Sequence, residues 1–259
     1  MSPFPQARVR VGAVDVWAVS EPDVAAHVVR CWARGEGGAV VTANVDIVRA
    51  ATRDRALGEL VAQSEVVVAD GMPVVWAGRL AGVAVPERVT GASLVFTLSE
   101  AAAREGRSVY LLGGEPGVPE KAADVLRARF DGLRVAGTDS PPFGFDRDAA
   151  LLGEAVAKVV EAKPDLVLVG LGFPKQERVI RELRAALPAA WYLGCGAGIP
   201  MAAGEFKRAS GVVQKMGAEW LHRLALEPRR LAKRYLRDDL PFAFRLLAGA
   251  VKTRLTKGK

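Results

Sequence analysis

The residues of this sequence that could do chemistry follow short apolar runs, where strands would end. Asp70 closes the run at 65–70 and precedes a glycine, and Thr42 and Asn44 close an earlier run. A carboxylate at a partly buried strand end can act as a general base if it reaches a substrate hydroxyl. On residue type alone, an N-cap for a helix beginning at Pro73 is the simpler interpretation of Asp70.

Three later apolar runs end in glycine-rich turns. These turns cover 113–114, 170–175 and 194–198, and they include Gly113, Gly172 and Pro174. Taken singly, most of these glycines are best explained as turn formers. Taken together, they fall where a site built from strand ends would need them.

The elements that must position these residues alternate between β-branched runs and Ala/Leu/Arg stretches. This alternation predicts an α/β fold with a parallel sheet covered by helices on both faces, and in such sheets ligands bind beyond the carboxyl ends of the strands. A hairpin is predicted at 9–19 with Gly12 at its bend, and Ser20 is expected to cap the first helix. Helices are predicted at 21–34, 54–63, 73–80, 92–105, 119–130, 148–162 and 175–186, and strands at 39–43, 65–70, 108–114, 133–138, 165–172 and 189–196.

Composition excludes several classes of protein. The chain has 259 residues, of which 50% are hydrophobic and 25% charged, so wholesale disorder is excluded. No apolar run approaches about 18 residues and the first residues lack the order of a signal peptide, so we expect an intracellular protein without a transmembrane helix. The two cysteines, Cys31 and Cys195, form no CxxC pair, and with only two histidines beside them no metal site is predicted.

Positive charge is concentrated at the C-terminal end. Residues 207–259 contain 14 Lys and Arg against four acids, a net charge of +10, whereas the rest of the chain carries −3. Apolar residues recur there at spacings of three, four and seven, as at Trp220, Leu224 and Leu231. Such basic amphipathic helices are typical of an anionic membrane surface, and a helix docked on the domain or on another subunit is the alternative.

Common catalytic motifs find little support. The sequence has no GxSxG and no Walker A segment, and no GxGxxG follows its first strands. Asp146–Arg147–Asp148 spells DxD, a pattern that can hold a divalent ion on a nucleotide-sugar. Because it precedes a predicted helix, an N-cap role for Asp148 is favoured.

Seven segments, in order, resemble the WecG/TagA/CpsF family of glycosyltransferases, also called glycosyltransferase family 26. Together they span about residues 42–235, and this number of ordered matches is highly specific. The segments are TANVDIV (42–48), ADGMPVVW (69–76), ERVTGASL (87–94), LLGGEPGV (111–118), GLGFPKQE (170–177), GCGAGIPMAAGEFKRAS (194–210) and EWLHRLALEPRRLAKRY (219–235).

The resemblance implies an inverting transferase with a Rossmann-like body. It implies transfer of N-acetylmannosamine, or a related hexose or hexosamine, from a UDP-sugar to a sugar linked to polyprenyl pyrophosphate. The product would belong to wall teichoic acid, capsule or exopolysaccharide synthesis. No cofactor is expected, and arginines and backbone N–H groups, rather than a metal, would stabilise the leaving UDP.

Residue by residue, the resemblance makes Asp70 the catalytic base and gives Thr42 and Asn44 a part in positioning substrate. It makes Arg88 a candidate for pyrophosphate contact. The glycine turns and the G-x-P-x-Q-E motif would line the nucleotide-sugar pocket; their residues are Gly113, Gly172, Pro174, Gln176 and Glu177.

The resemblance divides the chain into a body at 1–206 and a membrane-association appendage at 207–259. Its arginines would hold the membrane and close over the diphosphate; they are Arg223, Arg229, Arg230 and Arg234. This implies a cytoplasmic protein bound peripherally to the inner face of the cell membrane. Apolar surface on the appendage could also pair subunits as a homo-oligomer.

One segment departs from the family pattern. The family reads G-x-G-A-x-F-D where this chain has Ile199 and Pro200 in place of Phe-Asp, and Ser210 replaces a later proline. An acidic group near the pocket is therefore missing, which leaves the donor sugar and the acceptor open.

Two other functions remain as alternatives. A catalytically inactive family member could act as a scaffold for polysaccharide assembly, which the change at 199–200 favours and the retention of Asp70 and Gln176 disfavours. A nucleotide- or nucleic-acid-binding protein would stack aromatics over a basic groove. The aromatics of the C-terminal segment instead alternate on helical faces, so we expect no nucleic-acid partner.

Overall fold

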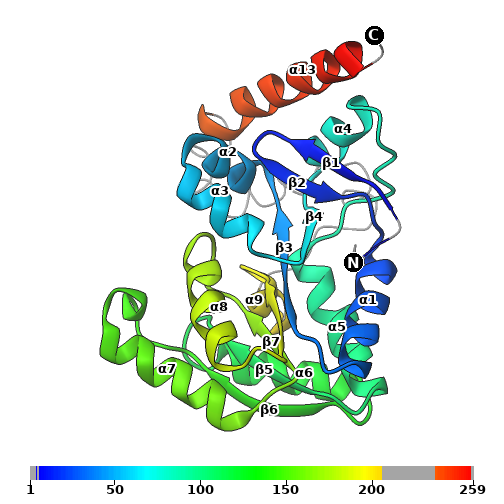
Figure 1. Cartoon of the computed structure of the whole chain (residues 1–259). Helices are drawn as coiled ribbons and strands as arrows, with labels where there is room; N and C mark the ends of the chain where they lie inside the picture. Colours follow the sequence, from blue (N-terminus) through cyan, green and yellow to red (C-terminus); the bar gives the residue numbers. More distant parts are fainter. Residues whose placement is uncertain (1–3, 5, 206–236, 258–259) are drawn as a thin grey trace.

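The computed structural model describes residues 4, 6–205 and 237–257, and within them one mostly parallel sheet forms the centre of the molecule (Figure 1). The sheet has eight strands in the order β1-β2-β4-β3-β8-β7-β5-β6. Only β1 and β2 pair antiparallel. The strands are β1 (Arg8–Val11), β2 (Val14–Trp17), β3 (Gly38–Ala43), β4 (Val66–Ala69), β5 (Ser108–Leu112), β6 (Arg134–Asp139), β7 (Leu166–Val169) and β8 (Trp191–Gly194).

Helices cover both faces of this sheet. One face packs against α1, α5, α6 and α9, and the other against α2, α3, α7 and α8. The helices are α1 (Glu21–Ala33), α2 (Val45–Arg53), α3 (Arg55–Ala62), α4 (Met72–Leu80), α5 (Gly91–Arg104), α6 (Val118–Arg129), α7 (Ala149–Ala162), α8 (Lys175–Ala186), α9 (Gly198–Ala202) and α13 (Leu240–Lys257), with a 3-10 turn, η1, at Phe145–Arg147. The predicted α/β fold with a Rossmann-like, helix-flanked parallel sheet is confirmed.

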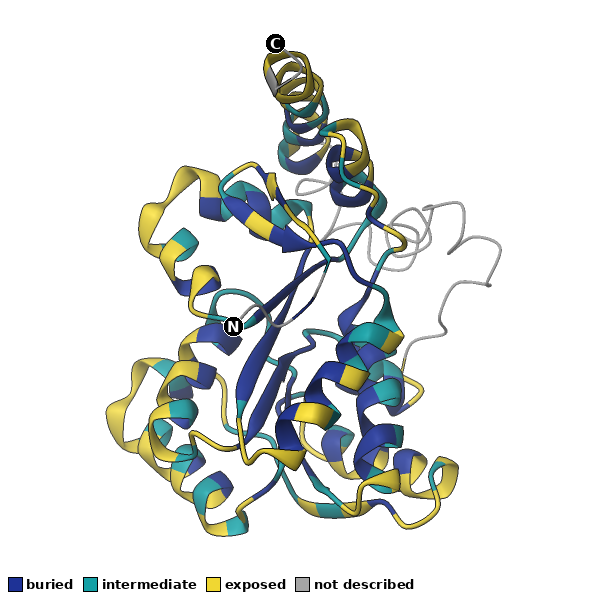
Figure 2. Ribbon diagram, turned by 45° about the vertical axis from the view of Figure 1, so that its right-hand side comes forward, coloured by how far each residue is buried: buried dark blue, intermediate teal, exposed yellow. Residues whose placement is uncertain are grey.

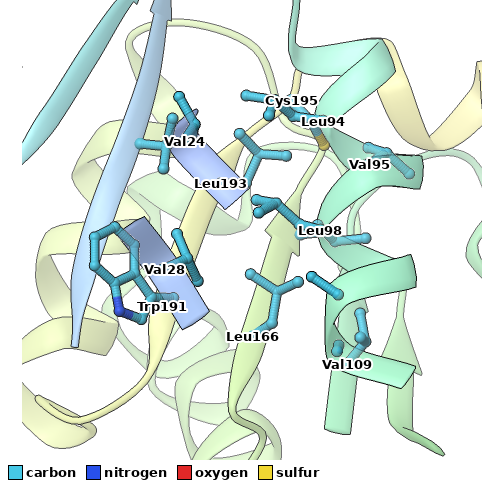
Figure 3. Close-up of a cluster of buried hydrophobic side chains, with 14 of the residues drawn as sticks. Val24, Val28, Leu94, Val95, Leu98, Val109, Leu166, Trp191, Leu193 and Cys195 are labelled. Atoms are coloured by element: carbon cyan, nitrogen blue, oxygen red, sulfur yellow. The ribbon is translucent and has the colours of Figure 1, made fainter. Parts of the chain in front are cut away.

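The central strands are apolar along their whole length because neither face meets water. Every residue of β3, β4, β7 and β8 is buried, as the blue strands of Figure 2 show. Figure 3 shows one side of this core, where Val28 of α1 and Leu98 of α5 lie against Leu166 and Leu193 of the sheet. A fully buried side chain of this size stabilises a fold by about 1.5–3 kcal/mol.

The local signals of the sequence are confirmed at several ends of elements. Gly12 turns the β1–β2 hairpin with a φ of +60°, and Ser20 caps α1 by accepting from the backbone N–H of Asp23. Asp148 caps α7 by accepting from two backbone N–H groups, as the capping interpretation of the DxD segment predicts. The helix α2 was not predicted, because its nine residues lie between a strand and a second helix that begins two residues later.

The described end of the C-terminal segment packs on the body rather than standing apart from it. Helix α13 lies against α4 and α2, with Leu246 and Ala243 buried in the contact. Arg49 on α2 donates to Asp239, just before α13, over 3.1 Å between Nε and Oδ1. The predicted boundary at 206–207 falls outside the described residues.

At the amino edge of the sheet, the carboxylate of Asp165 makes hydrogen bonds that join two neighbouring strands. Asp165, just before β7, accepts from the backbone N–H and the hydroxyl of Ser108 at 2.8 and 2.9 Å, and from Arg107 at 3.0 Å. Partial burial opposes ionisation of Asp165, but these hydrogen bonds outweigh it and hold its pKa below the usual 3.8. Its carboxylate therefore fastens the start of β5 to the start of β7.

We expect Asp165→Asn to lower the free energy of unfolding at pH 7 by about 1–3 kcal/mol, because a partly buried carboxylate oxygen that accepts hydrogen bonds is replaced by an NH₂ donor. A depressed carboxyl pKa stabilises the fold above its unfolded value and is lost as pH falls through the folded value. The gap between the two proteins should therefore shrink below about pH 4. Denaturant unfolding measures it; the exposed Asp124→Asn is the control, and a gap that persists unchanged at pH 2.5 contradicts the account.

Candidate functional site

The carboxyl ends of β3 and β4 bring Asp70 beside Asn44. Ala43 pairs with Ala69 in the parallel register, and the backbone N–H of Asp70 donates to the carbonyl of Ala43 at 2.9 Å. Thr42 is one residue earlier on β3 and is 7% exposed, whereas Asp70 is half-buried. These three predicted site residues therefore meet at one edge of the sheet.

Arg88 is carried to the same edge by the segment that precedes α5. The backbone N–H of Val89 donates to the carbonyl of Ala69 at 2.9 Å, which lays this segment along the end of β4. Arg88 is half-buried and directly precedes Val89, the donor of that bond. Asp70 directly follows Ala69, the acceptor. The structure thus brings a carboxylate and a guanidinium to the same strand end.

Asp70 does not cap the helix that follows it. The N-cap of α4 is Gly71, at a φ of +119°, and α4 receives no hydrogen bond from a capping side chain. The capping role favoured by residue type alone is therefore wrong. Asn44, by contrast, does cap α2: its Oδ1 accepts from the backbone N–H of Ile47 at 3.0 Å.

The start of α5 packs tightly on the ends of β3 and β8. A Cβ at Gly91 would lie 3.0 Å from the Cα of Cys195 and 3.2 Å from the hydroxyl of Thr42. Thr90 caps this helix by accepting from the backbone N–H of Ser93. Gly91 was not singled out from the sequence, although it lies inside the matched ERVTGASL segment, because close packing leaves no signal in spacing.

The ends of β5, β7 and β8 are also drawn together by small residues. A Cβ at Gly113 would lie 2.8 Å from the carbonyl oxygen of Gly170, and one at Gly170 would lie 3.0 Å from the δ-carbon of Ile199. Ile199 is fully buried in the first turn of α9. The departure from the family pattern at 199–200 thus places an apolar core residue, Ile199, directly beside the turn after β7.

Gln176 and Glu177 begin α8 as a buried polar pair, each 4% exposed. The carboxamide oxygen of Gln176 accepts from the backbone N–H groups of Gly172 and Gly196, both at 3.1 Å. Its Nε2 donates to Oε1 of Glu177 at 2.9 Å. Gln176 therefore joins the turn after β7 to the turn after β8.

Burial raises the pKa of Glu177 to about 7, although the hydrogen bond from Gln176 opposes that rise. The second carboxylate oxygen, Oε2, has no hydrogen-bond partner within the described part of the chain. The charge of this group is thus poorly solvated, and it titrates near neutral pH.

The DxD segment forms an ion pair with the start of α8. Lys175, at the start of α8, lies 3.5 Å from Oδ1 of Asp146 and 5.5 Å from the ring centre of the exposed Phe143. Among the described residues, no group of three or more His, Cys, Asp or Glu is arranged to hold a metal ion.

Four helices start at this edge without a capping side chain; α9 has only five residues, and the other three have at least nine. These three are α4, α6 and α8, which follow β4, β5 and β7 and have Gly71, Gly117 and Pro174 at their N-caps. The first N–H groups of a helix are unpaired within the helix, and they favour an anion. Pro73 and Pro119 carry no N–H, and the N–H groups of Val74, Val118 and Gln176 donate to nearby carbonyls. Each helix start therefore offers only part of its first turn to an anion.

The remaining sequence predictions concern the C-terminal segment. Arg223, Arg229, Arg230 and Arg234 lie outside the described residues, so their roles stay predictions. Across residues 4, 6–205 and 237–257, no helix combines the length and apolarity needed to cross a membrane.

Glu177→Gln should change how stability depends on pH. A carboxyl whose folded pKa is raised destabilises the fold progressively as pH rises above the unfolded value, from 4.5 to about 7. The amide keeps the shape and an acceptor for Gln176 but cannot ionise. We expect the variant to be more stable than the parent at pH 8, by up to about 3 kcal/mol, and equal to it near pH 4.5. Thermal unfolding at both pH values measures this; a difference that does not change with pH contradicts it.

One comparison with known proteins bears on this geometry. The family model described as "Glycosyl transferase WecG/TagA/CpsF family" matches residues 9–256, which includes nearly the whole chain. All strands and helices around the carboxyl edge fall inside the match. The chain therefore belongs to the WecG/TagA/CpsF family of glycosyltransferases.

Proposed function

We propose that this glycosyltransferase moves a sugar from a UDP-sugar to an acceptor sugar linked to polyprenyl pyrophosphate, with inversion at the anomeric carbon. The observation that carries the proposal is the position of Asp70. This carboxylate stands at the carboxyl end of β4, takes no part in capping α4, and lies at the same strand end as Arg88. Family membership makes sugar transfer the reaction to which such a group belongs.

In the proposed step, an acceptor hydroxyl attacks the anomeric carbon while Asp70 takes the hydroxyl proton. The bond between the anomeric carbon and the UDP oxygen breaks, and its electron pair leaves with UDP. A single displacement of this kind inverts the anomeric centre. Proton transfer to a positioned side chain typically contributes about 10²–10⁴-fold to a rate.

The leaving diphosphate gains negative charge, which preorganised donors can stabilise. We assign this task to Arg88 and to the backbone N–H groups of Met72, Glu120 and Lys175, in the first turns of α4, α6 and α8. Gly113 and Gly172, with φ of +107° and +78°, form the turns after β5 and β7 that lead into α6 and α8. In this assignment Thr42 and Asn44 position the acceptor, and Pro174, Gln176 and Glu177 shape the donor side.

The donor is N-acetylmannosamine or a related hexose or hexosamine in this proposal. Ile199 and Pro200 restrict which donor sugar fits, because they make the start of α9 apolar and uncharged. A donor with a neutral sugar therefore fits this chain better than one that needs an acidic partner there.

We further propose that α13 binds an anionic membrane surface from the cytoplasmic side. Phe244 and Leu255 are 66% and 69% exposed, although they are large apolar side chains. The helix carries four Lys and Arg residues and no acid. Figure 1 shows α13 at the end of the molecule toward which β3 points, so the site and this helix lie at the same end.

Replacing Asp70 by asparagine should abolish most transfer. Asparagine keeps the size of the side chain but cannot accept the proton, so we expect kcat to fall at least about a hundredfold with KM for the donor little changed. The assay is acceptor-dependent UDP release, with a short-chain GlcNAc-pyrophosphoryl-lipid and a panel of UDP-sugars.

The exposed Asp131→Asn serves as the matched control and should behave like the parent protein. Release that is equally fast in the Asp70 variant would contradict the assignment of the base. If no UDP-sugar gives acceptor-dependent release with the unmodified chain, the transfer proposal itself fails and the scaffold hypothesis gains.

Membrane binding should depend on the exposed apolar side chains of α13. We expect the pair Phe244→Glu and Leu255→Glu to weaken binding to vesicles rich in anionic lipid by at least about tenfold, because buried apolar area and cationic charge act together at such surfaces. Vesicle sedimentation measures this. Val125→Glu, a similar change on α6, is the control, and equal binding by both variants would refute the role of α13.

A further inference from the structure

A single oxygen atom holds two turns of the site together. Oε1 of Gln176 accepts from the N–H of Gly172, after β7, and from the N–H of Gly196, after β8. The two turns are 24 residues apart in sequence, and Gln176 belongs to neither, since it starts α8. The relative position of the turns therefore depends on how this carboxamide is oriented.

Only one orientation of the carboxamide satisfies these bonds. If the amide were rotated by half a turn, its NH₂ group would face two N–H donors and all three hydrogen bonds would be lost. The carboxylate of Glu177 selects the correct orientation, because an ionised or neutral carboxyl oxygen can accept from Nε2, as it does at 2.9 Å.

The last residue of β8 leaves the space in which this pair lies. A Cβ on Gly194 would stand 2.6 Å from Nε2 of Gln176 and 3.3 Å from Oε1 of Glu177. The pair is thus pressed against bare backbone, and both side chains are almost fully buried. Because Glu177 is only 4% exposed, almost none of its surface is available to contact a substrate.

We propose that Glu177 is a positioning residue of the transfer site: it fixes the Gln176 carboxamide, and through it the turns after β7 and β8. This inference rests on the proposed function and adds to it separate roles for Gln176 and Glu177. Gln176 makes the contacts between the turns, and Glu177 acts only through Gln176. Removing the Glu177 carboxyl would take away the acceptor for Nε2 of Gln176, which is a buried donor.

The test measures the hydrogen bonds to the two turns separately from sugar transfer. Amide hydrogen exchange at Gly172 and Gly196, followed by NMR, reports whether Oε1 still accepts from those two N–H groups. Acceptor-dependent UDP release reports kcat and KM for the donor. Glu177→Leu removes the acceptor and fills its volume, and Glu177→Ala removes it without filling the volume. Using both guards against the failure of one of them to fold, and Glu177→Gln restores an acceptor.

In the leucine and alanine variants we expect exchange at both glycines to be at least tenfold faster and kcat to fall at least tenfold. Glu177→Gln should restore most of both signals. Glu182→Gln, at an exposed position of the same helix, should match the parent protein in both.

Unchanged exchange at Gly172 and Gly196 in a folded leucine or alanine variant would overturn the inference. So would a glutamine variant as impaired as the leucine variant, since a direct role for the negative charge would then be needed. Failure of the proposed function has a different signature, namely no acceptor-dependent UDP release by the parent protein, and it leaves the exchange result readable.

Discussion

Burial of the sheet on both faces is the constraint on which the rest of this structure depends. Four central strands are buried at every residue, so polar groups can stand only where strands end. The two edges use them differently. At the amino edge, the carboxylate of Asp165 accepts hydrogen bonds that join β7 to the start of β5. At the carboxyl edge, Asp70 escapes the capping role that its position suggests, and α4, α6 and α8 begin without a capping side chain.

Close packing at the carboxyl edge turns these separate strand ends into one site. Gly91, Gly113 and Gly170 stand where a Cβ would press on backbone or on a neighbouring side chain, and the lack of a side chain there lets the ends of β3, β5, β7 and β8 approach each other. Gln176 then ties two of the turns with one oxygen atom. The same compactness that makes the site rigid explains why Glu177 is buried deeply enough to titrate near neutral pH.

Much of this arrangement follows from the sequence alone. Continuous apolar runs predict the parallel sheet, Ser20 and Asp148 predict helix starts, and the ordered motifs predict the family. The sequence could not reveal that Gly71 rather than Asp70 occupies the N-cap of α4, because both residues suit a helix start. Nor could it reveal α2, the packing of Gly91 against Cys195, or the bonds of Gln176 to both turns. Each of these depends on which residues meet across the sheet, and linear spacing carries no record of such contacts.

The central claim is that the donor diphosphate binds at the carboxyl edge, over the N–H groups that open α4, α6 and α8. The most direct measurement is an amide NMR titration of the full chain with UDP. The account predicts the largest shifts at the amides of Met72, Glu120 and Lys175, in the first turns of these helices, and at the glycine turns, with the amino-edge amides of Ser108 and Ala39 unmoved. Saturable shifts confined to other surfaces, or no shift at millimolar UDP, would contradict it.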